Sequence, residues 1–275
     1  SRDDGEPLGE LAKLAQGLNL FIGVALDDDI AGADGVNAAI ARSYSIDFLD
    51  QEHLYRIIEA NLFPKFRQTQ HLLHEIYTEL REVLPNFRWS EQRFTALYPL
   101  HPAILETAPF IRLYDKNFAI LSFAAEAGKK VLGRPANSLV ALDEVFDRVE
   151  KSLRSSSDLE AAFETYDKLN SEVVSAIPIM QRLPAKLILK ALLILSLDGD
   201  GTTASEISSA MLIYDENSPE NSIRNVEEHL ERFHLAYPQQ VNRLVVEGRE
   251  TRFGLKISGK DDLNQVLAER AAGVS

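Results

Sequence analysis

The pattern of apolar and polar positions begins with a run that is typical of a buried strand. Residues 18–26 are mostly apolar and are bounded by Gly17 and by three aspartates at positions 27–29. Strands of this kind are covered on both faces and belong to parallel sheets built from several strand–helix units. Too few residues precede position 18 to supply such units. We therefore expect the chain to be a fragment whose neighbouring strands lie elsewhere.

The pattern after this run is mainly helical. Apolar stripes predict helices over residues 8–16, 50–62 and 68–83, and Pro64 and Pro85 end the last two. Further helices are expected over residues 91–97, 103–112 and 117–131. A longer pair starts near Leu139 and Ser157 and folds back at the polar residues between them.

The pattern changes again from about Pro184. An apolar helix over residues 187–195 is followed by Thr203 and Glu206, whose spacing is that of a capping box at the start of a second helix. Ser218-Pro219 opens a third helix. Two alternating segments, 241–246 and 252–257, then predict a β-hairpin. Three helices followed by a hairpin is the order of a winged helix, an order that does not separate DNA binding from protein contact.

These elements predict a mainly α fold in three parts. Residues 1–66 form a partial α/β core, residues 67–178 a helical bundle and residues 179–275 a winged-helix domain. The chain of 275 residues is long enough for more than one packed core.

Composition limits the possible compartments and partners. No window reaches the length of a membrane span, the first residues lack the order of a signal peptide, and the chain has no cysteine. We expect a cytoplasmic protein without a membrane partner. The net charge of −13 opposes unselective attraction to nucleic acid, so any DNA contact must be local.

The motifs of catalysis and metal binding are missing from the sequence. Gly128-Lys129 is followed by Lys130 where a phosphate-binding loop needs Ser or Thr, so the chain is not expected to bind a nucleotide by itself. His71 and His74 lack a third ligand at a recognisable spacing. We predict no catalytic residue, no metal ligand and no cofactor in this chain.

A few arginines are candidates for binding phosphate. Arg42 lies near the edge of the expected sheet, where its fork-shaped guanidinium could reach a phosphate or form a surface ion pair. Candidates for DNA contact are Arg224 in the third terminal helix, which glutamates outnumber, and the hairpin arginines Arg243, Arg249 and Arg252. The alternative for the hairpin is an ordinary solvated face.

Several segments resemble one protein family. The run Leu20-Phe21-Ile22-Gly23-Val24-Ala25, the segment Ile40-Ala41-Arg42-Ser43-Tyr44 and residues 50–65 resemble the second half of the P-loop ATPase core of very large bacterial AAA+-like proteins. Such proteins occur in BREX and Pgl phage-defence systems. Tyr98-Pro99-Leu100-His101-Pro102 is similar to the box that begins their next helical region, and it is the most specific match.

The resemblance implies a function for each part. Residues 18–26 would be the sensor strand of a P-loop core and residues 86–175 a helical lid, and Arg42 would stand near a nucleotide or a neighbouring subunit. Arg112 is a loose substitute for the second-sensor arginine, since Phe118-Ala119 stands where an arginine–serine pair is common. ATP and Mg²⁺ would be bound by the parent protein and not by this chain.

Two functions follow as expectations. In the first, the chain is the regulatory lid and winged-helix segment of a large bacterial AAA+-like ATPase, acting in phage defence or another DNA transaction, and couples nucleotide state to DNA or to a protein partner. Its partners would be the upstream ATPase segment or a second copy of the chain, DNA, and other defence-system proteins. In the second, the chain is a non-enzymatic helical adaptor with a protein-binding winged helix.

Overall fold

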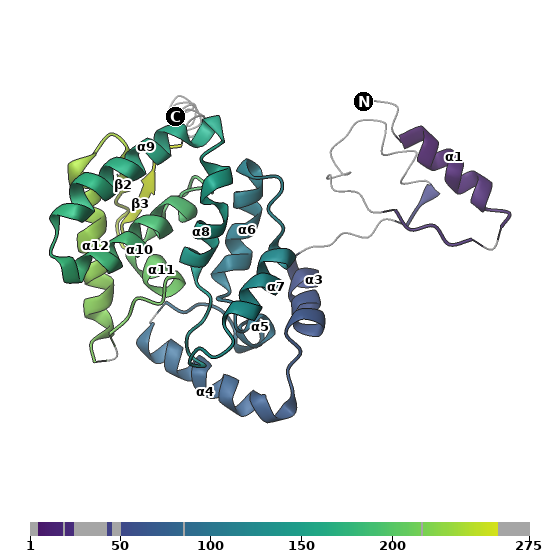
Figure 1. Ribbon diagram of the computed structural model, residues 1–275, viewed down its shortest axis with the longest axis horizontal. Helices are drawn as coiled ribbons and strands as arrows, with labels where there is room; N and C mark the ends of the chain where they lie inside the picture. The colour runs from purple at the N-terminus through teal and green to yellow at the C-terminus, as the bar shows by residue number, and fades with distance from the viewer. Residues whose placement is uncertain are drawn as a thin grey trace. The chain divides into compact units, whose positions relative to one another are not determined.

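The computed structural model describes residues 5–18, 20–24, 43–45, 51–84, 86–215 and 217–257. The chain separates into two compact units, Ser1–Asp50 and Gln51–Ser275. The described residues are mainly helical, as predicted (Figure 1). The part boundaries predicted after residues 66 and 178 both fall inside the second unit.

The first unit contains α1 (Gly5–Ala15), close to the predicted helix. The buried strand predicted over residues 18–26 is wrong for the residues described there: residues 20–24 have no regular structure, and Phe21 is 99% exposed. A strand needs a neighbour to satisfy its backbone groups, and the described part of this unit offers none. Its described segments meet where the Tyr44 hydroxyl donates to the Leu8 carbonyl over 3.0 Å.

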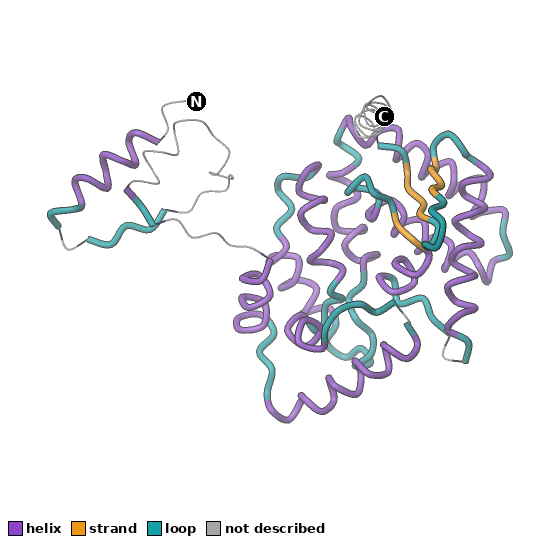
Figure 2. The backbone as a smooth tube through the Cα atoms, turned by 180° about the vertical axis from the view of Figure 1, so that it is seen from behind, coloured by secondary structure: helices purple, strands orange, loops and turns teal. Residues whose placement is uncertain are grey.

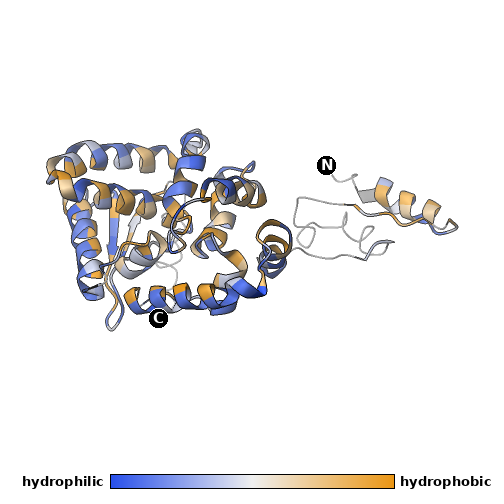
Figure 3. Cartoon of the chain, turned by 60° about the horizontal axis from the view of Figure 1, so that its bottom comes forward, coloured by the Kyte–Doolittle hydropathy of each residue, from blue (hydrophilic) through white to orange (hydrophobic). Residues whose placement is uncertain are grey.

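The second unit begins with a helical bundle that follows the predicted pattern. Its first elements are α3 (Gln51–Ile57), the π-helical turn η2 (Ile58–Leu62), α4 (Arg67–Val83), α5 (Glu91–Leu97) and α6 (Ala103–Tyr114). They are followed by α7 (Ile120–Lys130), α8 (Leu142–Leu153), η3 (Ser157–Leu159), α9 (Glu160–Lys168), η4 (Leu169–Val173) and η5 (Val174–Ala176). Figure 3 shows apolar and polar residues alternating along these helices, as expected where one face of each is buried.

Arg154 holds the hairpin between α8 and α9. Two of its N–H groups donate to the two carboxylate oxygens of Asp167, each over 2.9 Å. Its guanidinium also lies 4.4 Å from the ring centre of Phe163. The hydrogen bond to Asp167 raises the pKa of Arg154 further. The polar turn predicted between the two helices is therefore closed by one side chain.

The rest of the described chain combines three helices and a small sheet. The order is α10 (Ile179–Leu195), β1 (Thr202–Thr203), α11 (Ala204–Ala210), α12 (Pro219–Ala236), β2 (Val241–Leu244) and β3 (Arg252–Leu255). β3 lies between β1 and β2, antiparallel to both (Figure 2). The predicted capping box and hairpin are confirmed. The pairing of β1 with β3 was not expected from the sequence.

Gly201 allows β1 to approach β3. Its φ is +67°, and a Cβ at this position would lie 2.6 Å from the carbonyl oxygen of Phe253. No other residue fits both conditions, because a side chain is strained at this φ and would meet the backbone of β3.

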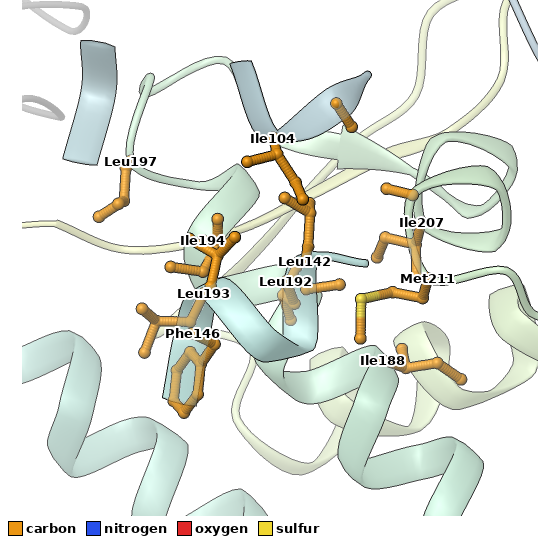
Figure 4. Packing of buried hydrophobic residues seen from close by; sticks show 14 of the residues in the cluster. Ile104, Leu142, Phe146, Ile188, Leu192, Leu193, Ile194, Leu197, Ile207 and Met211 are labelled. Carbon is orange, nitrogen blue, oxygen red and sulfur yellow. The ribbon is translucent and has the colours of Figure 1, made fainter. Parts of the chain in front are cut away.

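One hydrophobic cluster joins the bundle to the terminal elements. It extends from Tyr55 to Ile257, and α6, α8 and α10 pack side by side within it (Figure 1). Figure 4 shows side chains of α10 in the same cluster as Leu142 and Phe146 of α8, Ile207 of α11 and Met211 at the end of that helix. α10 therefore contributes to the core of both the bundle and the terminal elements.

Candidate functional site

The Tyr98-Pro99-Leu100-His101-Pro102 box connects α5 to α6, and its last three residues are buried. Leu100 forms a parallel bridge with Val140 in the segment before α8. The Val140 amide donates to the Pro99 carbonyl over 3.0 Å, and the His101 amide donates to the Val140 carbonyl over 2.9 Å. The Tyr98 hydroxyl donates to the Ala136 carbonyl over 3.0 Å. The box thus fixes the start of α6 against the chain that leads into α8.

His101 is fully buried and helps to begin α6. Its Nδ1 accepts from the Ala103 amide over 3.2 Å, and its ring lies edge-on to Phe87 and Trp89, with ring centres 5.6 and 4.8 Å away. Burial lowers the pKa of His101 to about 3. The Nε2 atom has no hydrogen-bond partner among the described residues. His101 is therefore a neutral side chain that helps to build the start of α6.

A polar cluster lies next to this box. The Trp89 Nε1–H donates to Glu106 Oε1 of α6, and Arg88 Nη2 donates to Glu106 Oε2, both over 2.7 Å. Burial disfavours the charge on Arg88, but its hydrogen bond to Glu106 and the charges of Glu106 and Glu206 raise its pKa. The cluster therefore keeps the arginine charged at the edge of the bundle.

Glu206 of α11 brings the terminal elements to the same cluster. Its Oε1 lies 3.7 Å from Arg88 Nη1, and its Oε2 lies 3.4 Å from Arg252 Nη2. The same Oε2 also accepts from the Thr203 amide over 3.1 Å as part of the capping box. One carboxylate thus joins a helix start, the bundle and β3.

The turn between β2 and β3 reaches the bundle. Asn86 Nδ2 donates to Glu250 Oε1 over 3.0 Å, and the Ser205 hydroxyl hydrogen-bonds to Glu250 Oε2. Arg252 donates from Nε to the Asp200 carbonyl over 3.0 Å and from Nη2 to the Gly201 carbonyl over 2.5 Å. The hairpin is therefore fastened where its turn leads into β3.

These contacts border a groove between the bundle and the terminal elements, which we call the junction groove. A smaller part of about 180 Å³, the more enclosed of the two, lies between α6, the end of α10 and α11. A wider part of about 730 Å³ extends over Tyr77 and Phe87 toward Glu250. Asn86, Arg88, Trp89 and Glu206 line both parts.

Of the two arginines that the sequence nominated for nucleotide sensing, only Arg112 belongs to the described part of the chain. Arg42 lies outside the described residues. Arg112 is exposed in the last turn of α6 and does not line the junction groove.

The four arginines nominated for DNA contact also differ in their surroundings. Arg224 of α12 donates to Asn221 over 2.5 Å, and Arg243 of β2 donates to Glu231 over 2.7 Å. Arg249 is exposed in the hairpin turn. Only Arg252 of the four lines the junction groove, where it donates to backbone carbonyls.

Sequence reasoning missed most of the residues that form the groove. Arg88, Trp89 and Glu106 belong to no motif, and Glu206 was recognised only as a helix cap. Among the described residues, no group of three or more His, Asp or Glu side chains could hold a metal ion, and no helix is long and apolar enough to cross a membrane.

Comparisons with known proteins identify a family. No curated protein and no solved structure matches the chain significantly. The family model described as DUF6079 second domain matches residues 66–246, which include the bundle from α4 onward, α10 to α12 and β2. This match spans more than half of the sequence, so the chain belongs to the DUF6079 second-domain family.

Proposed function

We propose that this chain is a non-catalytic regulatory segment of a large AAA+-like ATPase of phage defence, in which the bundle and a terminal winged helix pass nucleotide state to a protein partner. The resemblance of residues 8–150 to BREX- and Pgl-type ATPases supports the ATPase context. The shared cluster around α10 supports the coupling, because a displacement of the bundle would carry the terminal elements with it.

The element order supports a winged helix. α10, β1, α11 and α12 are followed by the β2–β3 hairpin, and the sheet order is β1-β3-β2. A short strand between the first two helices that pairs with the last strand is typical of winged-helix domains. This order alone leaves the partner open.

The hairpin side chains bind to the chain itself, which favours a protein partner over DNA. This observation is the main support for the proposal. Arg252 donates to carbonyls of the chain itself, and Glu250 fastens the turn to Asn86. The exposed face of α12 mixes both charges, from Glu220, Arg224, Glu228 and Arg232. A phosphate backbone needs clustered positive charge, which these surfaces lack.

Fluorescence anisotropy of a labelled DNA duplex tests the choice of partner. We expect no saturable binding by the chain at physiological salt. If the chain does bind, the slope of log affinity against log salt concentration can be compared among variants. A slope that falls by about one for each of R224A, R243A and R249A would favour a DNA-binding winged helix instead. Arg148→Ala in α8 is a matched control, because it removes an exposed arginine outside the terminal elements.

The coding sequence upstream of residue 1 tests the ATPase context. A G-x-x-x-x-G-K-[ST] loop followed by a strand that ends in acidic residues would support it. An upstream sequence without either motif would favour the adaptor function, in which the same protein contacts serve no ATPase.

A further inference from the structure

The enclosed part of the junction groove contains a polar group that the described fold does not use. Ser209 of α11 lines this cavity and is 2% exposed. Its hydroxyl has no hydrogen-bond partner in the described part of the chain. A buried hydroxyl without a partner is unfavourable, so a ligand group that reaches it through a small shift of the cavity wall is favoured.

The charges around the groove select a cation. Its two parts are lined by more carboxylates than arginines: Glu91, Glu106, Asp198, Glu206 and Glu250 against Arg81, Arg88 and Arg252. The chain as a whole carries a net charge of −13. Both the local and the overall charge attract a basic partner and oppose a phosphate backbone.

The apolar surfaces of the groove suit long basic side chains. Tyr77, Phe87 and Trp89 line the wider part, and Phe110 and Leu195 line the enclosed part. Arginine and lysine pack their apolar stems on such surfaces while their charged ends reach carboxylates. Arg88 already lies in this way over the Trp89 ring, 5.4 Å from its centre.

We infer that the junction groove binds an extended basic segment of a partner protein. The wider part takes the peptide backbone, and one arginine or lysine side chain enters the enclosed part beside Ser209, Asp198 and Glu206. A buried anchor surrounded by weaker polar contacts is a common arrangement in interfaces. This inference goes beyond the proposed function, because it concerns the groove and holds whatever α12 contacts.

The fluorescence of Trp89 can report binding in the groove, since Trp89 is the single tryptophan of the sequence and lines both parts of the groove. We expect a saturable change in its fluorescence on titration of the chain with a capped hexapeptide of arginine, and none with a hexapeptide of glutamate. E250Q removes one groove carboxylate and should weaken binding about two- to fivefold, the range of a surface ion pair. S209L fills the cavity and should abolish the response.

Matched variants separate a site from general attraction to an acidic protein. Glu164→Gln removes an equal charge from the exposed face of α9 and should leave the affinity unchanged. Equal weakening by E164Q and E250Q would overturn the inference, as would a response to a DNA duplex instead of the peptide. D198N gives a second cavity variant with a small change of shape, so the test does not depend on S209L folding.

Discussion

Thr203 and Glu206 cap each other at the start of α11. The Thr203 hydroxyl accepts from the Glu206 amide over 3.2 Å, and the Glu206 carboxylate accepts from the Thr203 amide over 3.1 Å. Because Glu206 also faces Arg88 and Arg252, this helix start positions the centre of the junction groove.

Loss of this cap should be measurable as lost stability. Thr203→Ala removes the acceptor of the Glu206 amide and is expected to lower the free energy of unfolding by about 1 kcal/mol. Thr203→Ser keeps the hydroxyl and should lose much less. Urea unfolding followed by circular dichroism compares the three proteins, and equal midpoints for all three would contradict the assigned cap.

Gly201 should tolerate no side chain. Gly201→Ala combines a left-handed backbone with a Cβ placed against the Phe253 carbonyl, so we expect a loss of more than about 2 kcal/mol. Gly248 in the hairpin turn is a matched control, since its φ is +73° and nothing lies within 4 Å of an added Cβ. Gly248→Ala should lose only about 1 kcal/mol. Similar melting temperatures for the two variants would argue against the close approach of β1 to β3.

Because His101 is buried in its neutral form, the free energy of unfolding of the chain should fall in mild acid. Its pKa is about 3 in the folded chain and about 6.5 when unfolded. Between these values only the unfolded chain binds the proton, so stability is lost as the pH falls from about 6.5 toward 3, by up to about 1.4 kcal/mol per pH unit. Denaturant titrations at several pH values compare the chain with His101→Asn, which keeps an acceptor for the Ala103 amide. Parallel pH profiles for the two proteins would contradict a neutral buried histidine.

Arg154 should not be replaceable by lysine. An ammonium group cannot form the two-bond contact with Asp167 while lying flat over Phe163, so Arg154→Lys should destabilise the chain by about 1 kcal/mol. Arg148→Lys is the control, because the Arg148–Glu126 pair is 3.7 Å long and both side chains are more than half exposed. Thermal unfolding of both variants measures the difference, and equal effects would show that Arg154 contributes only charge.

Most helices could be predicted because the residues that begin and end a helix lie within or next to it in the sequence. The capping box at Thr203 and the proline that opens α12 act within one turn, and both elements begin as predicted. The run at residues 18–26 was misinterpreted because an apolar segment becomes a buried strand only when distant strands cover it. Its described residues have no such neighbour and remain exposed.

The junction groove could not be read from the sequence for a similar reason. Arg88 and Glu206 are far apart along the chain, and an ion pair across such a separation leaves no periodic pattern. Arg252 was a candidate for DNA contact, with an ordinary solvated face as the alternative, whereas the pairing of β1 with β3 brings it to the carbonyls of Asp200 and Gly201. The Ser209 hydroxyl lacks a partner in the described part of the chain because of how distant elements pack around it, and no sequence pattern records that packing.

The shared position of α10 has a consequence for synthesis on the ribosome. A chain released up to η5 has made α8, but Leu142 and Phe146 still lack the α10 side chains that cover them. Nascent domains that expose apolar surface are prone to aggregate until their partners emerge. The bundle therefore cannot complete its core before α10 leaves the exit tunnel, and a ribosome that stalls just after η5 would hold an intermediate with exposed apolar surface that is prone to aggregate.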